Sequence, residues 1–199
     1  MAEILSMRNT ILSIAAVLLS GALTAQGVFS NKTQSILEKV IQDYPNHFHN
    51  IRGELVSQAH ETTAYRSTVQ LPGSPSCMVV LTGSGSNGAA AGEGYSWTCT
   101  VLEAESFEKA RERFHDIYGQ LSNSIINSSA QKTFILSGQY EEPSAERKDT
   151  RVVFSLLPGV GEMKWLRVEL LLQQDAAGRW RILLSVNDRE AMMGAMTVN

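Results

Sequence analysis

The two cysteines of the chain, Cys77 and Cys99, each lie in a short run with the alternation of a β-strand, residues 77–82 and 95–102. If these runs pair antiparallel with the cysteines opposite each other, the thiols are close enough to form a disulfide. The same register makes two apolar cross-strand pairs, Val79 with Trp97 and Leu81 with Tyr95. A slip of one residue would turn all these side chains to the opposite face, so the sequence predicts one register and one disulfide.

Export from the cytoplasm is predicted by the N-terminal segment, in which Arg8 precedes an apolar run that ends in small residues. We assign residues 1–27 to a signal peptide cut between residues 20 and 27, and residues 28–199 to a single α+β domain. A buried helix and a membrane anchor are the alternatives, although the run is shorter than the roughly 20 residues that span a bilayer. Export predicts a periplasmic or secreted protein with no stable membrane span after cleavage, and an oxidising compartment favours the disulfide.

Hydrophobic periodicity predicts two main helices and seven strands. The first helix lies within residues 31–51 and is ended or kinked by Pro45. The second follows an N-cap at Ser106 and runs to residues 127–129. Its apolar stripe is Phe107, Ala110, Phe114, Ile117, Leu121 and Ile125. The other predicted strands are 62–73, 133–140, 150–157, 164–174 and 179–186, which gives an antiparallel sheet, or sheets, in the order α-βββ-α-ββββ.

This order resembles two helix-plus-meander halves, although no residue-level repeat accompanies it. In the last hairpin, the turn at residues 175–178 predicts four apolar pairs: Leu172 with Trp180, Leu170 with Ile182, Val168 with Leu184, and Leu166 with Val186. The alternation places Trp97 and Trp180 in the core. It places Trp165 on the solvent face, as the best candidate for an aromatic ligand contact.

Nucleic acids and nucleotides are excluded as partners. The formal net charge of −3 leaves no basic excess for binding phosphates. The chain does contain G-x-G-x-x-G, at Gly83, Gly85 and Gly88, but Gly92 and Gly94 would break the helix that a dinucleotide loop needs. We interpret residues 83–94 as a long hairpin loop, with a lid or partner-contact loop as the alternative.

His47 and His49 are candidate ligand contacts, because they would share a face in an extended segment. His60 follows eleven residues later, but no cysteine or carboxylate stands at a metal-motif spacing. We therefore predict no metal site, no cofactor and no catalytic residue. His47, His49 and Trp165 are the possible contacts to a ligand.

The chain is similar to small uncharacterised exported proteins of Gram-negative bacteria. The similarity rests on the segment LTAQ, the segment DYPNHFHNIRGE at residues 43–54, the cysteine-linked strand pair and the helix before the last strands. It implies a periplasmic or secreted protein and assigns no functional residue.

Two functions remain. The favoured one is an exported, non-enzymatic domain that binds an unidentified protein or small molecule. The alternative is a hydrolase of envelope material that uses histidines or carboxylates. A pocket joining His47, His49 or His60 to a carboxylate would favour the hydrolase, and a smooth sheet surface with an exposed Trp165 would favour binding.

Overall fold

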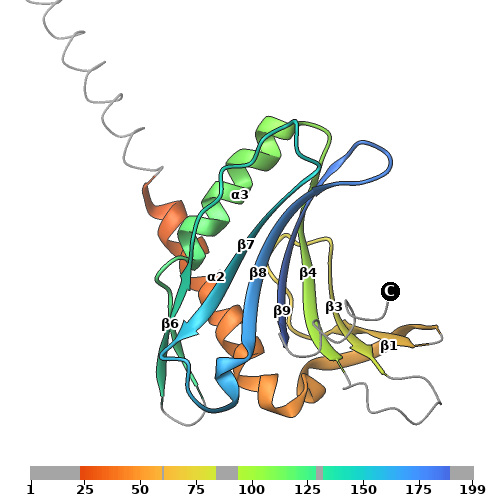
Figure 1. Ribbon diagram of the computed structural model, residues 1–199, viewed down its shortest axis with the longest axis vertical. Coiled ribbons are helices and arrows are strands. Elements are labelled where there is room, and N and C mark those ends of the chain that lie inside the picture. The colour runs from red at the N-terminus through yellow and green to blue at the C-terminus, as the bar shows by residue number, and fades with distance from the viewer. Residues whose placement is uncertain (1–22, 60, 84–93, 129–131, 189–199) are drawn as a thin grey trace, which may run out of the picture.

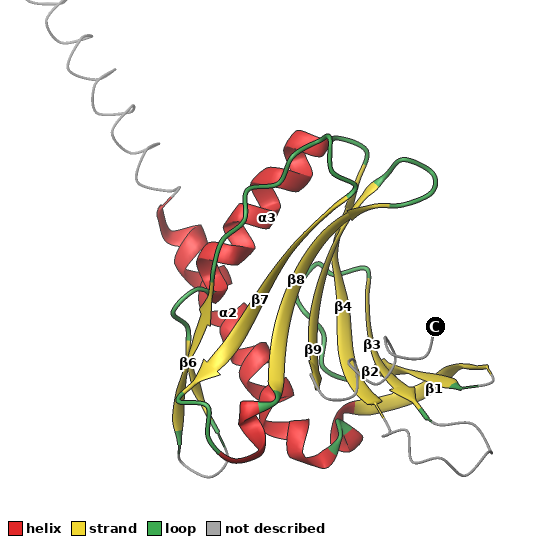
Figure 2. Cartoon of the chain, viewed as in Figure 1, coloured by secondary structure: helices red, strands yellow, loops and turns green. Residues whose placement is uncertain are grey.

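The computed structural model describes residues 23–59, 61–83, 94–128 and 132–188. Helices α2 and α3 cover one side of a bent antiparallel sheet (Figures 1 and 2). In chain order the elements are α2 (Leu23–Asp43), the 3-10 turns η1 (Tyr44–Asn46) and η2 (His49–Ile51), β1 (Arg52–Ala59), β2 (Thr62–Ser67), β3 (Ser76–Thr82), β4 (Gly94–Ala104), α3 (Phe107–Leu121), β5 (Ile125–Asn127), β6 (Thr133–Gly138), β7 (Asp149–Leu157), the 3-10 turn η3 (Gly161–Lys164), β8 (Leu166–Gln174) and β9 (Trp180–Asp188).

The sheet joins two helix-plus-meander halves. Its strand order is β1-β2-β3-β4-β9-β8-β7-β6-β5, so the last strand of each half meets the other in the middle. The predicted α+β class with an antiparallel sheet is confirmed, but the predicted order α-βββ-α-ββββ is wrong because it omits β1 and β5. Strand β1 is an exposed edge strand without alternating burial, and β5 has only three residues. Neither carries the period-two signal by which a strand is recognised.

Helix α3 begins as predicted and ends earlier. The Ser106 hydroxyl accepts a hydrogen bond from the Lys109 amide at 3.4 Å, which caps the N-terminus. The helix stops at Leu121, because Ser122 is extended and Asn123 has a φ of 61°. Ile125, which we expected to extend the buried stripe, instead lies in β5 and is 51% exposed.

Helix α2 starts at Leu23, inside the range 1–27 predicted as a signal peptide, and ends at Asp43, just before Pro45. Leu37, Val40 and Ile41 are fully buried, which confirms the amphipathic pattern. Within the described residues, neither helix has the length and apolar character needed to cross a membrane.

The predicted disulfide and register are both confirmed. The S–S distance between Cys77 and Cys99 is 1.99 Å, and the two Cα atoms lie 4.0 Å apart. The strands β3 and β4 pair with Cys77 opposite Cys99, Val79 opposite Trp97 and Leu81 opposite Tyr95.

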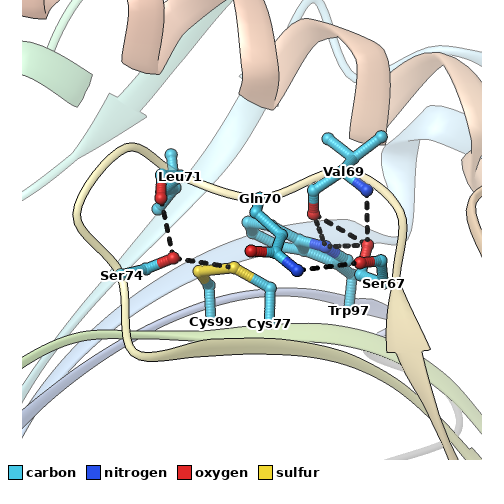
Figure 3. Close-up of a disulfide and its surroundings, with 8 residues drawn as sticks. All are labelled: Ser67, Val69, Gln70, Leu71, Ser74, Cys77, Trp97 and Cys99. Carbon is cyan, nitrogen blue, oxygen red and sulfur yellow. Dashed lines mark hydrogen bonds between the residues drawn. A yellow bond between two sulfur atoms is a disulfide. The ribbon is translucent and has the colours of Figure 1, made fainter.

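An arch of residues 68–75 covers the disulfide on the helix side of the sheet (Figure 3). The Trp97 indole N–H donates to the Ser67 hydroxyl at 3.0 Å and to the Val69 carbonyl at 3.3 Å. The predicted strand 62–73 therefore ends at Ser67, where the chain turns to satisfy the buried indole.

The last hairpin has the predicted faces but a different register. Leu172 pairs with Ile182, Leu170 with Leu184 and Val168 with Val186, two residues away from the predicted partners. The loop holds five residues, because the Asp175 carboxylate accepts from the Ala177 and Arg179 amides, both at 2.9 Å. The left-handed Gly178, with a φ of 81°, completes this turn. Trp180 then pairs with Gln174 and is buried, as Trp97 is.

Candidate functional site

The segment between α2 and β1, residues 44–51, is a compact double turn built around one carboxylate. Asp43 is only 6% exposed. Its side chain accepts from the Asn50 amide nitrogen at 3.0 Å, the Asn50 side-chain amide at 2.6 Å and the Ile51 amide at 3.2 Å. The Asn46 side-chain amide donates to the same carboxylate at 3.1 Å. These bonds connect Asp43, at the start of the turn, to residues in its middle and at its end, so the carboxylate holds the backbone of the turn in place.

Two consecutive residues of this turn are left-handed although neither is glycine. His47 has a φ of 54° and Phe48 a φ of 57°. This conformation costs about 1–2 kcal/mol per residue, so other contacts must hold it. Phe48 is fully buried and its ring centroid lies 6.0 Å from that of Tyr44. His47 points the other way, and its ring centroid lies 4.1 Å from that of Tyr95 in β4.

A pocket of about 410 Å³ opens between this double turn and the ends of the first strands. Its size lies within the range of small-molecule sites. The turn supplies amide and imidazole groups, and the strands supply hydroxyl, apolar and aromatic groups. The lining residues are Asn46, His47, His49, Arg52, Glu61, Thr63, Leu81, Thr82, Gly83 and Tyr95.

Arg52 is the cation of this pocket. Its Nη2 donates to the His47 carbonyl at 2.7 Å, and its guanidinium carbon lies 5.8 Å from the centroid of the Tyr65 ring. Its Nε is buried, and no described residue accepts a hydrogen bond from it. Among the described residues, no carboxylate oxygen lies within 4.0 Å of a guanidinium nitrogen of Arg52, so Arg52 forms no ion pair with them. Within residues 23–59, 61–83, 94–128 and 132–188, the guanidinium is thus held in place without a counter-charge.

The pocket also brings His47 and His49 onto the same lining as the carboxylate of Glu61. In the part of the chain that the structure describes, that carboxylate makes no hydrogen bond with either imidazole, and no group of three histidine, cysteine or acidic residues could hold a metal. His60, the third predicted candidate, lies outside the described residues, as do residues 84–93 of the predicted glycine loop.

Trp165, the third predicted contact, lies elsewhere. It follows η3, is 37% exposed, and is covered in part by the Lys164 ammonium 4.6 Å from the centre of its ring. It does not line the pocket.

A row of exposed apolar residues crosses β5, β6 and β7, where Ile125 pairs with Ile135 and Ile135 with Leu157.

Tyr44 connects the double turn to the far half of the chain. Its hydroxyl donates to the Asp188 carboxylate at 2.6 Å, at the end of β9. Burial, followed by the hydrogen bond to Asp188 and its negative charge, raises the pKa of Tyr44 above its usual range. The phenol therefore stays protonated as a donor at every physiological pH.

A second hollow, of about 480 Å³, lies over the exposed side of α3. Its arginine is already paired, because the Arg111 guanidinium lies 2.8 Å from Glu108 and 3.9 Å from Glu142. His115 lies there on the helix surface, edge-on to Tyr140 at 5.6 Å. We do not assign a ligand to this hollow.

Sequence reasoning identified His47 and His49 but missed Arg52, Thr63, Leu81 and Tyr95 as pocket residues. The register predicted that Leu81 opposes Tyr95, and that pairing does put both on one side of the sheet. A signal for Arg52 was its place in the segment DYPNHFHNIRGE, directly after the turn that holds both histidines. No protein-family model matches the sequence, and no curated protein is similar to it, so the site is defined by its geometry alone.

Proposed function

We propose that the protein is an exported binding domain that takes a small-molecule ligand in the pocket between the double turn 44–51 and strands β2 to β4. The observation that carries the proposal is the strained turn itself. Two left-handed residues, His47 and Phe48, are held by Asp43 and by packing, and the strain presents one imidazole to the pocket. Backbone strain of this kind is typical of ligand sites, where it fixes a side chain in advance of binding.

The pocket chemistry supports binding over catalysis. A small number of polar groups next to an aromatic wall is the usual composition of a ligand site. A histidine that acts as a general base is commonly oriented by a third group, and among the described residues no hydrogen bond joins the Glu61 carboxylate to the imidazole of His47 or His49.

A pocket-filling variant tests this proposal. Thr63 lines the pocket from β2, so Thr63→Trp would place an indole inside it. We expect a mixed library of small fragments to contain compounds that raise the Tm of the wild-type protein, since a ligand that binds only the folded state stabilises it. Those compounds should have no effect on Thr63→Trp.

The matched control is Thr133→Trp, which makes the same change at an exposed position of β6. It should respond to the fragments as the wild-type protein does. If the fragments stabilise Thr63→Trp equally, or if none stabilises the wild-type protein, the proposed binding function is wrong.

Export is supported by two independent features, the N-terminal signal pattern and the Cys77–Cys99 disulfide. Disulfides persist in oxidising compartments and are rare in the cytosol. We expect the full-length gene product to be recovered from the periplasm or the medium with a new N-terminus between residues 20 and 27. N-terminal sequencing measures this, and an intact N-terminus on a cytosolic product would contradict it.

Hydrolysis of envelope material is the second candidate, because the pocket does bring His47 and His49 near a carboxylate, that of Glu61. This is the arrangement that we expected of an enzyme. Ester and amide probes would then be turned over by the wild-type protein and not by His47→Asn or His49→Gln. Asparagine is the suitable replacement at His47 because it tolerates the left-handed conformation. Unchanged background rates in all three proteins would exclude this candidate.

A further inference from the structure

We infer that the ligand of this pocket carries a carboxylate group and that the Arg52 guanidinium binds it. The inference rests on the proposed function, since it names the chemical class of the molecule that the pocket takes. It makes Arg52 the specificity-determining residue of the site, a role for which the sequence offered no motif.

Neutral contacts hold Arg52 in the pocket. One hydrogen bond to the His47 carbonyl, at 2.7 Å, and the face of Tyr65 fix the guanidinium in place. In the described part of the chain, the buried Nε has no hydrogen-bond partner and no carboxylate pairs with the charge. Buried donors in native proteins are almost always satisfied, and an unpaired half-buried charge is costly. An anionic ligand that meets the Nη end of the guanidinium would compensate the charge.

The shape of the guanidinium and the charge of the lining determine which kind of anion fits. The planar guanidinium fork matches the two oxygens of a carboxylate and forms short, charge-assisted hydrogen bonds with them. Asn46 and Thr63, both on the lining, add neutral donors. Glu61 lies on the same lining, and its negative charge would repel a phosphate dianion more strongly than a monoanion. One guanidinium, neutral donors and one carboxylate therefore favour a monoanionic carboxylate.

The aromatic and apolar part of the lining can contact the body of the ligand. His47 and Tyr95 form an aromatic wall with ring centroids 4.1 Å apart, and Leu81 lies beside it. Such a wall offers a planar or apolar group a surface against which to pack. The ligand class is thus a small organic acid with a planar or apolar body, for which benzoate is the simplest probe.

Four probes that share a phenyl ring differ in the charge and shape of their polar group: benzoate, benzamide, benzylamine and phenyl phosphate. Titrations would follow the backbone amide signals of Thr63, Gly83 and Tyr95 by ¹H–¹⁵N NMR. We expect benzoate to bind about tenfold or more tightly than benzamide, because a charge-assisted hydrogen bond is roughly twice as strong as a neutral one and two would form. Benzylamine should not bind, and phenyl phosphate should bind more weakly than benzoate.

The variants assign the effect to Arg52. Arg52→Gln should lower benzoate affinity by about tenfold or more and leave benzamide affinity unchanged. Arg66→Gln, which removes an exposed arginine from the neighbouring strand β2, should change neither. Because Arg52 also bonds the His47 carbonyl, Arg52→Lys is the second variant: it keeps the charge without the fork and should give an intermediate affinity.

Each outcome has one meaning. Equal affinity for benzoate and benzamide, unchanged benzoate affinity in both Arg52 variants, or tighter binding of phenyl phosphate would overturn the carboxylate assignment. If the carboxylate assignment is overturned but benzamide or benzylamine still binds in the pocket, the proposed binding function is still supported. If all four probes and the fragment library fail to bind the wild-type protein, both proposals are wrong.

Discussion

Asp43 and His47 show how single residues build the site. The Asp43 carboxylate is buried and receives backbone and side-chain donors from residues 46–51. It stabilises a turn in which His47 and Phe48 are left-handed. The stabilisation of charge-assisted hydrogen bonds and the cost of two left-handed residues are of similar size, so the turn exists only while both Asp43 and the packing of Phe48 persist.

Removing the Asp43 carboxylate should therefore destabilise the protein and the pocket together. We expect Asp43→Ala to lower the free energy of unfolding by about 2–3 kcal/mol, because the buried amide of Ile51 loses its acceptor. Urea unfolding measures the change. Asp116→Ala, an exposed residue of α3, serves as the control and should stay within about 0.5 kcal/mol of the wild-type protein. Equal stability of both variants would show that Asp43 does not hold the turn.

Tyr44 makes the stability of the protein depend on pH in the alkaline range. The pKa of its phenol is raised in the folded state, so the unfolded chain loses this proton first as the pH rises. The contribution is fully present below the ordinary tyrosine pKa and declines above it. Tyr44→Phe should be about 1.5–3 kcal/mol less stable at pH 7, since it loses the bond to Asp188. Its stability should fall less steeply than that of the wild-type protein above about pH 10. Parallel unfolding curves from pH 8 to pH 11 would contradict the assignment.

At the scale of elements, periodicity predicted those structures whose burial alternates along the chain. The buried positions of α3 and the β3–β4 register followed from it. The same reasoning failed where a local polar contact overrides the period. The helix does not continue from Leu121 to Ile125 because Asn123 is left-handed, and β2 ends where Ser67 meets the indole of Trp97.

The candidate site was harder to predict than the fold. His47 and His49 stood out by composition, and both do line the pocket. Arg52, Thr63 and Tyr95 reach the pocket from β1, β2 and β4, and their proximity depends on the pairing of those strands. Strand β1 was not predicted because its side chains are exposed on both faces, so its contribution to the pocket, Arg52, was missed.

Gly53 lies where β1 approaches its neighbour β2 closely, so this position leaves no room for a side chain. A Cβ at Gly53 would lie 2.8 Å from the Arg66 carbonyl oxygen in β2. Because this oxygen belongs to the backbone, Gly53→Ala should force the strands apart and cost about 1–3 kcal/mol. Gly119→Ala is the opposite control, since nothing lies within 4 Å of a Cβ there. In the helix α3 that change should add about 0.5–1 kcal/mol. Thermal unfolding compares the two, and a stabilising Gly53→Ala would contradict the close approach.

At the scale of the whole molecule, the two helix-plus-meander halves share one sheet through β4 and β9. The Cys77–Cys99 disulfide lies beside this junction, because Cys99 of β4 also pairs with Leu184 of β9. The pocket lies in the first half, at the end of β4 that Tyr95 marks, and the bond from Tyr44 to Asp188 connects it to the second half.

Loss of the disulfide should weaken the whole fold. The bridge closes a separation of 22 residues, for which loop entropy predicts about 3 kcal/mol. We expect the double variant Cys77→Ala and Cys99→Ala to lose about this amount in urea unfolding. Peptide mapping without reductant should recover the two cysteines as one linked pair from the exported wild-type protein. Two free thiols in that protein would contradict both the bridge and the support that it gives to export.

The location of the binding site is the central claim, and chemical-shift mapping tests it most directly. The measurement titrates the fragments that raise the Tm into ¹⁵N-labelled protein and records which backbone amides move. We predict that the perturbed amides cluster in residues 46–52, 61–63 and 81–83 and at Tyr95, around the pocket. Perturbations that cluster instead at Trp165 and along the exposed row of Ile125, Ile135 and Leu157 would contradict the claim and place binding on the open surface of the sheet.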